Sequence, residues 1–228
     1  MKKKLLASLL VSSAVVGASL APLSVQAVTT GNTPVQVELG GGTLPDGDSI
    51  EPNTKDPDPN ASNTNFDLLY IPEMISFQKK MISDDLSAIS SVSKATFGVG
   101  DLRGTKEGWH VTATIPEMTN GEDTLTGEFS FTQSGFVVTY DEATNIFSGR
   151  GGDIFKNTPG APEFPATNSI RIGGGAVLVG NAVSGKGQGM WASYLSEKRL
   201  NITTPYQQLK AGIYSGNVTW NLVAGPSI

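Results

Sequence analysis

Apolar and polar residues alternate with a period of two along most of the chain after residue 65. In the stretch 125–131, Leu125, Phe129 and Phe131 fall on one side of an extended backbone and Glu128 falls on the other. Short runs of similar character recur between glycine-rich turns. They predict further strands at Phe66–Ile71, Lys94–Val99, Trp109–Ile115, Phe136–Tyr140, Ser169–Ile172, Ala176–Val179, Arg199–Thr203 and Tyr214–Val223. About eight to ten strands of this kind predict an all-β fold, an antiparallel β-sandwich or barrel-like domain with long loops.

One stretch has a spacing that suits a helix. In Gln78–Ser91, the apolar residues Met81, Leu86 and Ile89 recur at roughly helical intervals, so we expect one short helix there. The proline-rich stretch Thr158–Pro165 is expected to be a loop, because proline fixes φ and donates no backbone hydrogen bond.

The first 27 residues have the pattern of a secretory signal peptide. Three lysines precede the apolar run Leu5–Leu20, and Val25-Gln26-Ala27 is a small-residue cleavage site, so we expect cleavage after Ala27. The apolar run is shorter than the roughly 20 residues that span a bilayer. The mature chain is therefore expected to be secreted and to contain no transmembrane segment.

Composition separates residues 28–65 from the rest of the chain. This stretch holds five prolines and six acids against a single lysine, while all 17 aromatic residues lie from Phe66 onward. A segment without aromatic residues buries too little apolar area to offset the entropy of ordering it. We therefore predict an acidic, proline-rich, disordered linker over residues 28–65, with Val35–Leu39 as its one strand-like stretch, and a β domain over residues 66–228.

Charge and residue usage narrow the functional classes. The chain has no cysteine and one histidine, which removes disulfides, cysteine-based zinc sites and thiol catalysis, and fits export from a bacterium. Its net charge is −5, and loss of residues 1–27 leaves 13 basic and 21 acidic side chains, a net charge of −8. Nucleic acid is an unfavourable partner at this charge, and no cofactor is expected.

Two tryptophans lie in register with aliphatic neighbours on predicted strands. Trp109 shares a strand face with Val111, and Trp220 shares one with Tyr214 and Leu222. This phasing is typical of core side chains. An alternative is that one ring stays partly open in a groove and stacks on the apolar face of a sugar.

These tryptophans also carry a resemblance to a known family. Trp220-Asn221-Leu222, close to the C-terminus, resembles the distal Trp-x-Leu motif of the WxL family of bacterial cell-surface proteins. The stretch Val99–Thr112 resembles the proximal motif of that family, except that Val111 stands where leucine is usual. The order of a signal peptide, an acidic segment and then a β domain also matches the family.

The resemblance implies a location on the Gram-positive cell surface through non-covalent binding to peptidoglycan. It further implies association with other WxL proteins and with a membrane-anchored WxL-interacting protein. Independently, Leu44–Asp48 is a sortase-like pattern at the wrong end of the chain, so surface retention would have to be non-covalent. Two functions stay open: an anchoring or adhesion module that binds the wall, and a protein-docking module that uses an exposed strand or groove.

The candidate ligand-binding residues come from these motifs. They are Trp109, Val111, Trp220, Asn221, Leu222, Tyr214, Arg103 and Asp101. The tryptophans with Val111 and Leu222 either frame a recognition groove or hold its walls. Arg103 either pairs with Asp101 to brace a turn or binds a peptide-stem carboxylate. Asn221 either donates to a sugar or faces water.

Catalytic and metal-binding alternatives are weaker. Glycoside hydrolysis needs two acids flanking a groove, yet of the available acids only Glu128 lies within a clear strand. Gly180–Lys186 matches the start of a phosphate-binding loop, but Gly187 replaces the hydroxyl residue that would hold Mg²⁺. Asp56–Asn60 has the alternation of a calcium loop, but Ala61 replaces the required glycine. We therefore expect a binding protein that is not an enzyme and holds no metal.

Overall fold

The computed structural model describes residues 31–227, and residues 39–227 belong to one compact unit. The expected signal peptide lies outside the described residues. Residues 31–38 fall in a separate unit, and all of them are exposed.

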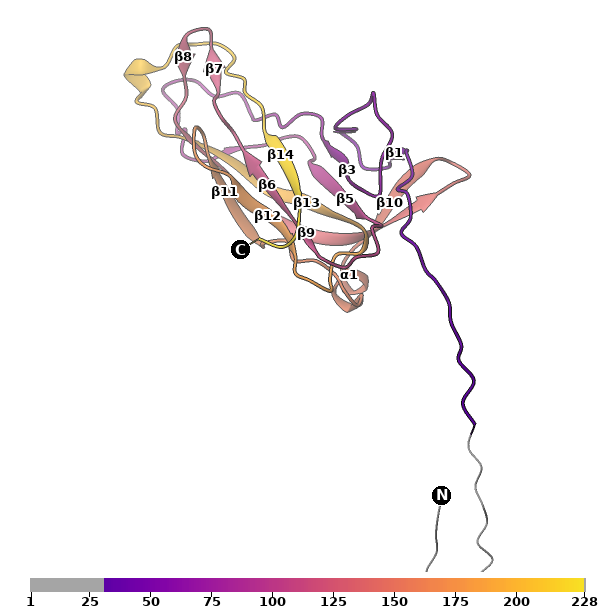
Figure 1. The fold of residues 1–228 in the computed structure, drawn as a ribbon. Helices are drawn as coiled ribbons and strands as arrows, with labels where there is room; N and C mark the ends of the chain where they lie inside the picture. The colour runs from indigo at the N-terminus through magenta and orange to yellow at the C-terminus, as the bar shows by residue number, and fades with distance from the viewer. Residues whose placement is uncertain (1–30, 228) are drawn as a thin grey trace, which may run out of the picture. The chain divides into compact units, whose positions relative to one another are not determined.

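The domain is mostly β, as predicted from the alternation of apolar and polar residues (Figure 1). Its larger, nearly closed sheet has the order β1-β10-β9-β13-β5-β3-β2, with β11 also paired to β9 and β4 to β13. The strands of this sheet are β1 (Asp48–Ser49), β2 (Thr54–Lys55), β3 (Phe66–Pro72), β4 (Ile89–Ser90), β5 (Thr96–Asp101), β9 (Gly127–Asp141), β10 (Ile146–Arg150), β11 (Thr167–Arg171) and β13 (Gly189–Ile202). Its pairs are antiparallel apart from β1 with β10.

A second, three-stranded sheet has the order β12-β6-β14. Its antiparallel strands are β12 (Val177–Ala182), β6 (Trp109–Thr114) and β14 (Thr219–Ala224). The hairpin of β7 (Thr119–Asn120) and β8 (Asp123–Thr124) and the 3₁₀ turn Tyr206–Gln208 lie at one end of the domain, and helix α1 (Asp153–Asn157) lies at the other (Figure 1).

The main core lies where side chains from both sheets meet. Phe97 on β5, Trp109 on β6 and Phe131 on β9 are among its buried members. Alternation along the strands directs every second side chain into this core. Strand β6 shows this most clearly, because its residues alternate between buried and half-buried positions along the whole strand. A second buried cluster forms around Phe147 on β10 and Tyr70 on β3.

The expected helix over residues 78–91 is wrong. This stretch is a loop that ends in β4, and Met81 is 64% exposed rather than packed. Side chains near its centre bond to nearby backbone: Asp84 accepts from the Met81 N–H at 2.8 Å and Asp85 from the Ser87 N–H at 2.9 Å. Such local bonds favour turns over helix. Within the described residues, the one α-helix is α1, just before the proline-rich loop.

The structure also differs from the expected linker over residues 28–65. The compact unit begins at Leu39, and this region contributes β1, β2 and the buried side chain of Leu44. The Leu44 N–H donates to the carbonyl of Thr64 at 2.8 Å. Leu44 thus packs this proline-rich segment into the second buried cluster, and β1 and β2 pair with strands of the larger sheet. Val35, by contrast, is 95% exposed and lies in no strand.

Candidate functional site

The proximal tryptophan is fully buried. Trp109 and Val111 each have 0% of their surface exposed, on the core side of β6. The Trp109 indole Nε1 donates to the carbonyl oxygen of Gly187 at 2.9 Å. This bond satisfies the polar atom that a buried tryptophan brings with it. In this arrangement neither Trp109 nor Val111 reaches the protein surface.

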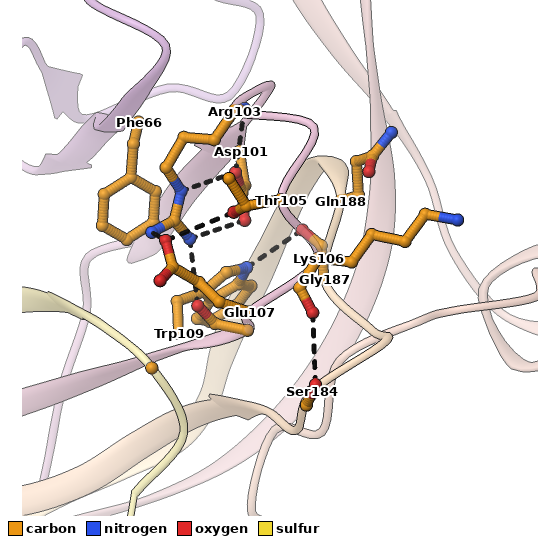
Figure 2. A network of polar contacts seen from close by, with 12 residues as sticks. Phe66, Asp101, Arg103, Thr105, Lys106, Glu107, Trp109, Ser184, Gly187 and Gln188 are labelled. Carbon is orange, nitrogen blue, oxygen red and sulfur yellow. Dashed lines mark hydrogen bonds and ion pairs between the residues drawn. The ribbon is translucent and has the colours of Figure 1, made fainter. Parts of the chain in front are cut away.

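Gly187 accepts from two indoles. The Trp191 Nε1 donates to the same carbonyl at 3.0 Å, so one loop residue satisfies both buried rings. Gly187 has a φ of +82°, and a Cβ there would collide with Ala182 and with the Trp109 indole. The glycine that breaks the phosphate-loop pattern is therefore required by packing. Figure 2 shows the Trp109 indole directed at this carbonyl.

Asp101 and Arg103 form a largely buried ion pair before the turn into β6. The Arg103 Nε and Nη2 donate to the two carboxylate oxygens of Asp101 at 2.9 and 2.8 Å, while only 2% of the Asp101 side chain and 11% of the Arg103 side chain are exposed. Arg103 also donates to the Gly108 carbonyl at 2.9 Å and to Glu107, and its guanidinium carbon lies 3.7 Å from the Phe66 ring centroid (Figure 2).

These contacts occupy the guanidinium of Arg103. The hydrogen bonds to Asp101 raise the pKa of Arg103 above its ordinary value, so the group stays charged. Its donors are directed at Asp101, Glu107 and a backbone carbonyl, which matches the turn-bracing interpretation of the sequence. We call the contacts among Asp101, Arg103 and Phe66 the clasp. The clasp holds the exposed turn Gly104–Glu107 next to the start of β6.

The distal motif lies beside the proximal one in the small sheet. Leu222 on β14 pairs with Val111 on β6, and Trp220 pairs with Ala113. The Trp220 ring lies 5.0 Å from that of Phe97 at an interplanar angle of 31°, and it stays half-buried. Asn221 is exposed between them, opposite Thr112.

Strand β14 is the end strand of its sheet, so one of its edges is unpaired in the described part of the chain. Tyr214 precedes it, half-buried, with its hydroxyl oxygen accepting from the Lys210 N–H at 3.1 Å. The structure therefore brings the two motifs together as adjacent strands. It does not gather the eight candidate residues into one open groove.

A surface pocket of about 510 Å³ lies beyond the Gly187 loop. The Gly187 N–H donates to the Gly160 carbonyl at 2.7 Å, which joins this loop to the proline-rich loop 158–165. Residues lining the pocket include Phe155, Pro162, Glu163, Phe164, Pro165 and Asn181. The Phe164 ring lies 6.4 Å from that of Trp109 and 5.8 Å from that of Phe97. The proximal motif thus supports one wall of the pocket from inside.

Sequence reasoning missed Trp191, Phe155 and Phe164. Trp191 lies in a run of buried residues on β13 that has no alternation to reveal it. Phe164 did carry a signal, because it lies in a proline-rich loop, Pro162-Glu163-Phe164-Pro165, where its ring is not part of a strand. Phe155 lies in the short helix α1, for which the pattern gave no indication.

The acid that lies within a clear strand is engaged by a neighbouring strand. Glu128, the one acid in a clear strand, is exposed and accepts from the Ser169 hydroxyl at 2.8 Å. Over residues 31–227, no group of three or more His, Cys, Asp or Glu side chains is placed to hold a metal ion. None of the helices in that range is long and apolar enough to cross a membrane.

Comparison with known protein families gives a match. A family model described as "WxL domain surface cell wall-binding" matches residues 25–226. The chain belongs to this family, whose described role is binding at the cell surface. No curated protein and no solved structure matches the chain.

Proposed function

We propose that this domain binds peptidoglycan non-covalently and serves as an anchoring or adhesion module that performs no reaction. The family description supports a surface role in wall binding. The observation that carries the proposal is the surface pocket lined by Phe155 and Phe164, at the place where the proximal motif holds the neighbouring loops. Shallow pockets with aromatic walls and a few polar groups suit neutral polymers better than ionic capture.

The motif residues divide into two groups in this proposal. Asp101, Arg103, Trp109 and Val111 hold the loops and sheet in place, because they are buried or fully engaged within the protein. The other sequence candidates are exposed or half-buried and lie on or before β14, outside the pocket lining; they are Trp220, Asn221, Leu222 and Tyr214.

A second candidate function rests on the unpaired edge of β14. An edge strand presents free backbone N–H and C=O groups to which another strand can add. Trp220 and Leu222 are half-buried on this strand and would gain cover from such an addition. In this alternative the domain docks another WxL protein or a membrane-anchored WxL-interacting protein.

Purified sacculi distinguish the two functions. We expect the purified chain to sediment with sacculi stripped of protein, and to do so equally at low salt and at about 0.3 M salt, where the Debye length is shorter than at physiological salt. Retention by whole cell envelopes but not by stripped sacculi would instead support protein docking. Loss of binding at the higher salt would show that charge, not surface fit, holds the protein.

A further inference from the structure

The pocket beside the Gly187 loop has features that specify its ligand. We propose that it binds one N-acetylated pyranose ring of the wall glycan, with Phe155 and Phe164 as the stacking surface and Asn181 as a hydrogen-bond donor. This inference rests on the proposed wall-binding function and adds the chemical class of the ligand and the residues that contact it.

The two phenylalanine rings form a supported platform. Their centroids lie 6.0 Å apart at an interplanar angle of 36°, and both rings are only partly buried. Trp191 packs edge-on against Phe155 at 6.0 Å. Rings that are held from behind lose little further freedom when a ligand binds, which favours affinity.

Two glycines make room for this platform. A Cβ on Gly135 of β9 would meet both rings, lying 2.6 Å from Phe164 Cδ2, and a Cβ on Gly180 of β12 would lie 3.2 Å from Phe164 Cε1. Neither glycine has a positive φ, so both positions need a small residue for space and not for backbone freedom. Close approach of the rings to two strands sets the depth of the pocket.

Asn181 on β12 also lines the pocket and carries its amide there. Its backbone N–H and C=O exchange hydrogen bonds with Glu163 at 2.8 and 2.7 Å, and its side-chain oxygen accepts from the Ser227 N–H at 3.0 Å. With the oxygen engaged, the amide NH₂ is the group left to donate, and it has no hydrogen-bond acceptor among the described residues. An acetamido carbonyl or a ring hydroxyl suits this donor.

The charge of the pocket favours a neutral ligand. Glu163 is exposed and lies 3.9 Å from Lys186, a long and solvent-screened ion pair. Its carboxylate can accept from sugar hydroxyls but repels the free carboxylates of peptide stems. A pyranose ring, with an apolar C–H face and hydroxyls at its edge, matches two aromatic rings flanked by an amide and an acid. The pocket volume of about 510 Å³ accommodates a ligand of this size.

The direct test is titration of the purified chain with a soluble β-1,4-linked tetramer of N-acetylglucosamine, followed by calorimetry and tryptophan fluorescence. Because Phe155 contacts Trp191 and Phe164 contacts Trp109, binding should change the indole emission. We expect Asn181→Ala and Phe164→Leu each to weaken binding about tenfold, the effect of losing roughly one good polar or stacking contact.

Two matched substitutions serve as controls. Phe77→Leu removes a half-buried ring that packs on Phe129 outside the pocket, and Asn217→Ala removes an exposed amide elsewhere. Both should leave tetramer binding unchanged. Asn181→Ala keeps both phenylalanines in place, so the test stands even if Phe164→Leu unfolds the domain.

The outcomes separate this inference from the proposed function. Wild-type binding to sacculi, with pocket variants that bind equally well, would overturn the glycan pocket and leave wall binding intact. A peptide stem that binds while the sugar tetramer does not would also overturn it. Failure of the wild-type chain to bind sacculi at all would remove the proposed function itself.

Discussion

At the scale of single residues, one loop carbonyl organises much of the site. Gly187 accepts from Trp109 and Trp191, which come from different sheets, and its N–H reaches Gly160 in the proline-rich loop. A glycine tolerates the positive φ of this position and leaves space for the Trp109 ring. A single loop residue therefore links both sheets to the pocket.

Substitution of Gly187 should lower the free energy of unfolding, and a control can separate steric overlap from backbone strain as the reason. Gly187→Ala combines positive-φ strain with overlap against Ala182 and Trp109, and we expect it to lower the free energy of unfolding by about 2–4 kcal/mol. Gly185→Ala is the control, because Gly185 has a φ of +88° but open space around its Cβ position, so only about 1 kcal/mol should be lost. Urea denaturation measures the free energy of unfolding of both variants. Equal decreases in the two variants would show that backbone strain alone accounts for the effect.

Tyr70 should make the folded protein less stable at alkaline pH. Burial raises the pKa of Tyr70 well above its ordinary value of 10.0, so its phenol stays neutral in the folded state while it ionises in the unfolded chain. The stability it contributes is complete below pH 10 and declines above that pH, by about 1.4 kcal/mol per pH unit.

The substitution Tyr70→Phe should remove this dependence. We expect the free energy of unfolding to fall less between pH 9 and pH 11 for the variant than for the wild type. Denaturation at the two pH values measures the difference, and identical slopes in both proteins would show that Tyr70 is ionised when folded.

At the scale of secondary-structure elements, alternation predicts the strands that have one buried face. Strand β6 is the clearest example, since its residues alternate in burial from Trp109 to Thr114. The first half of β13 escaped prediction because Trp191, Ala192 and Ser193 are all buried, and a strand covered on both faces shows no alternation. The loop at 78–91 imitated a helix because three apolar residues happened to fall near helical spacing.

One surface change on β14 tests whether the wall ligand contacts this strand or the pocket. Asn221→Lys places a charge on the exposed face of this edge strand, where it should change stability by no more than about 0.5 kcal/mol. Wall binding through the pocket predicts unchanged retention on stripped sacculi. If retention on sacculi falls severalfold while thermal stability holds, the ligand contacts β14 and not the pocket.

At the scale of the whole molecule, contacts distant in sequence define both the domain and its candidate site. The Trp109–Gly187 bond spans 78 residues, and the pocket is assembled from α1, the loop 158–165 and β12. The two Trp motifs could be identified from the sequence by resemblance, but neither their pairing as adjacent strands nor the pocket could be predicted, because no local pattern encodes which strands and loops meet. The compact unit begins at Leu39, before the boundary expected at Phe66, and Leu44, which is isolated among polar and small residues in the sequence, is buried within it.

Truncation tests that boundary. A chain that begins at Leu39 should unfold with the same midpoint as the chain from residue 28, whereas one that begins at Phe66 lacks Leu44, β1 and β2. Loss of the Leu44 side chain from the core alone should remove about 1.5–3 kcal/mol from the free energy of unfolding. Equal stability of the two shorter chains, measured by calorimetry, would restore the linker interpretation.

The clasp that joins Asp101, Arg103 and Phe66 also constrains how this surface can be reused. The turn it fixes and the loop that accepts from the Trp109 indole come from segments far apart in the chain, and the Lys106 carbonyl in the turn accepts from the Gly185 N–H in the loop at 2.8 Å. Grafting the turn and the start of β6 without the Gly187 loop would leave the buried Trp109 indole N–H without an acceptor. A functional transplant has to carry both pieces at once.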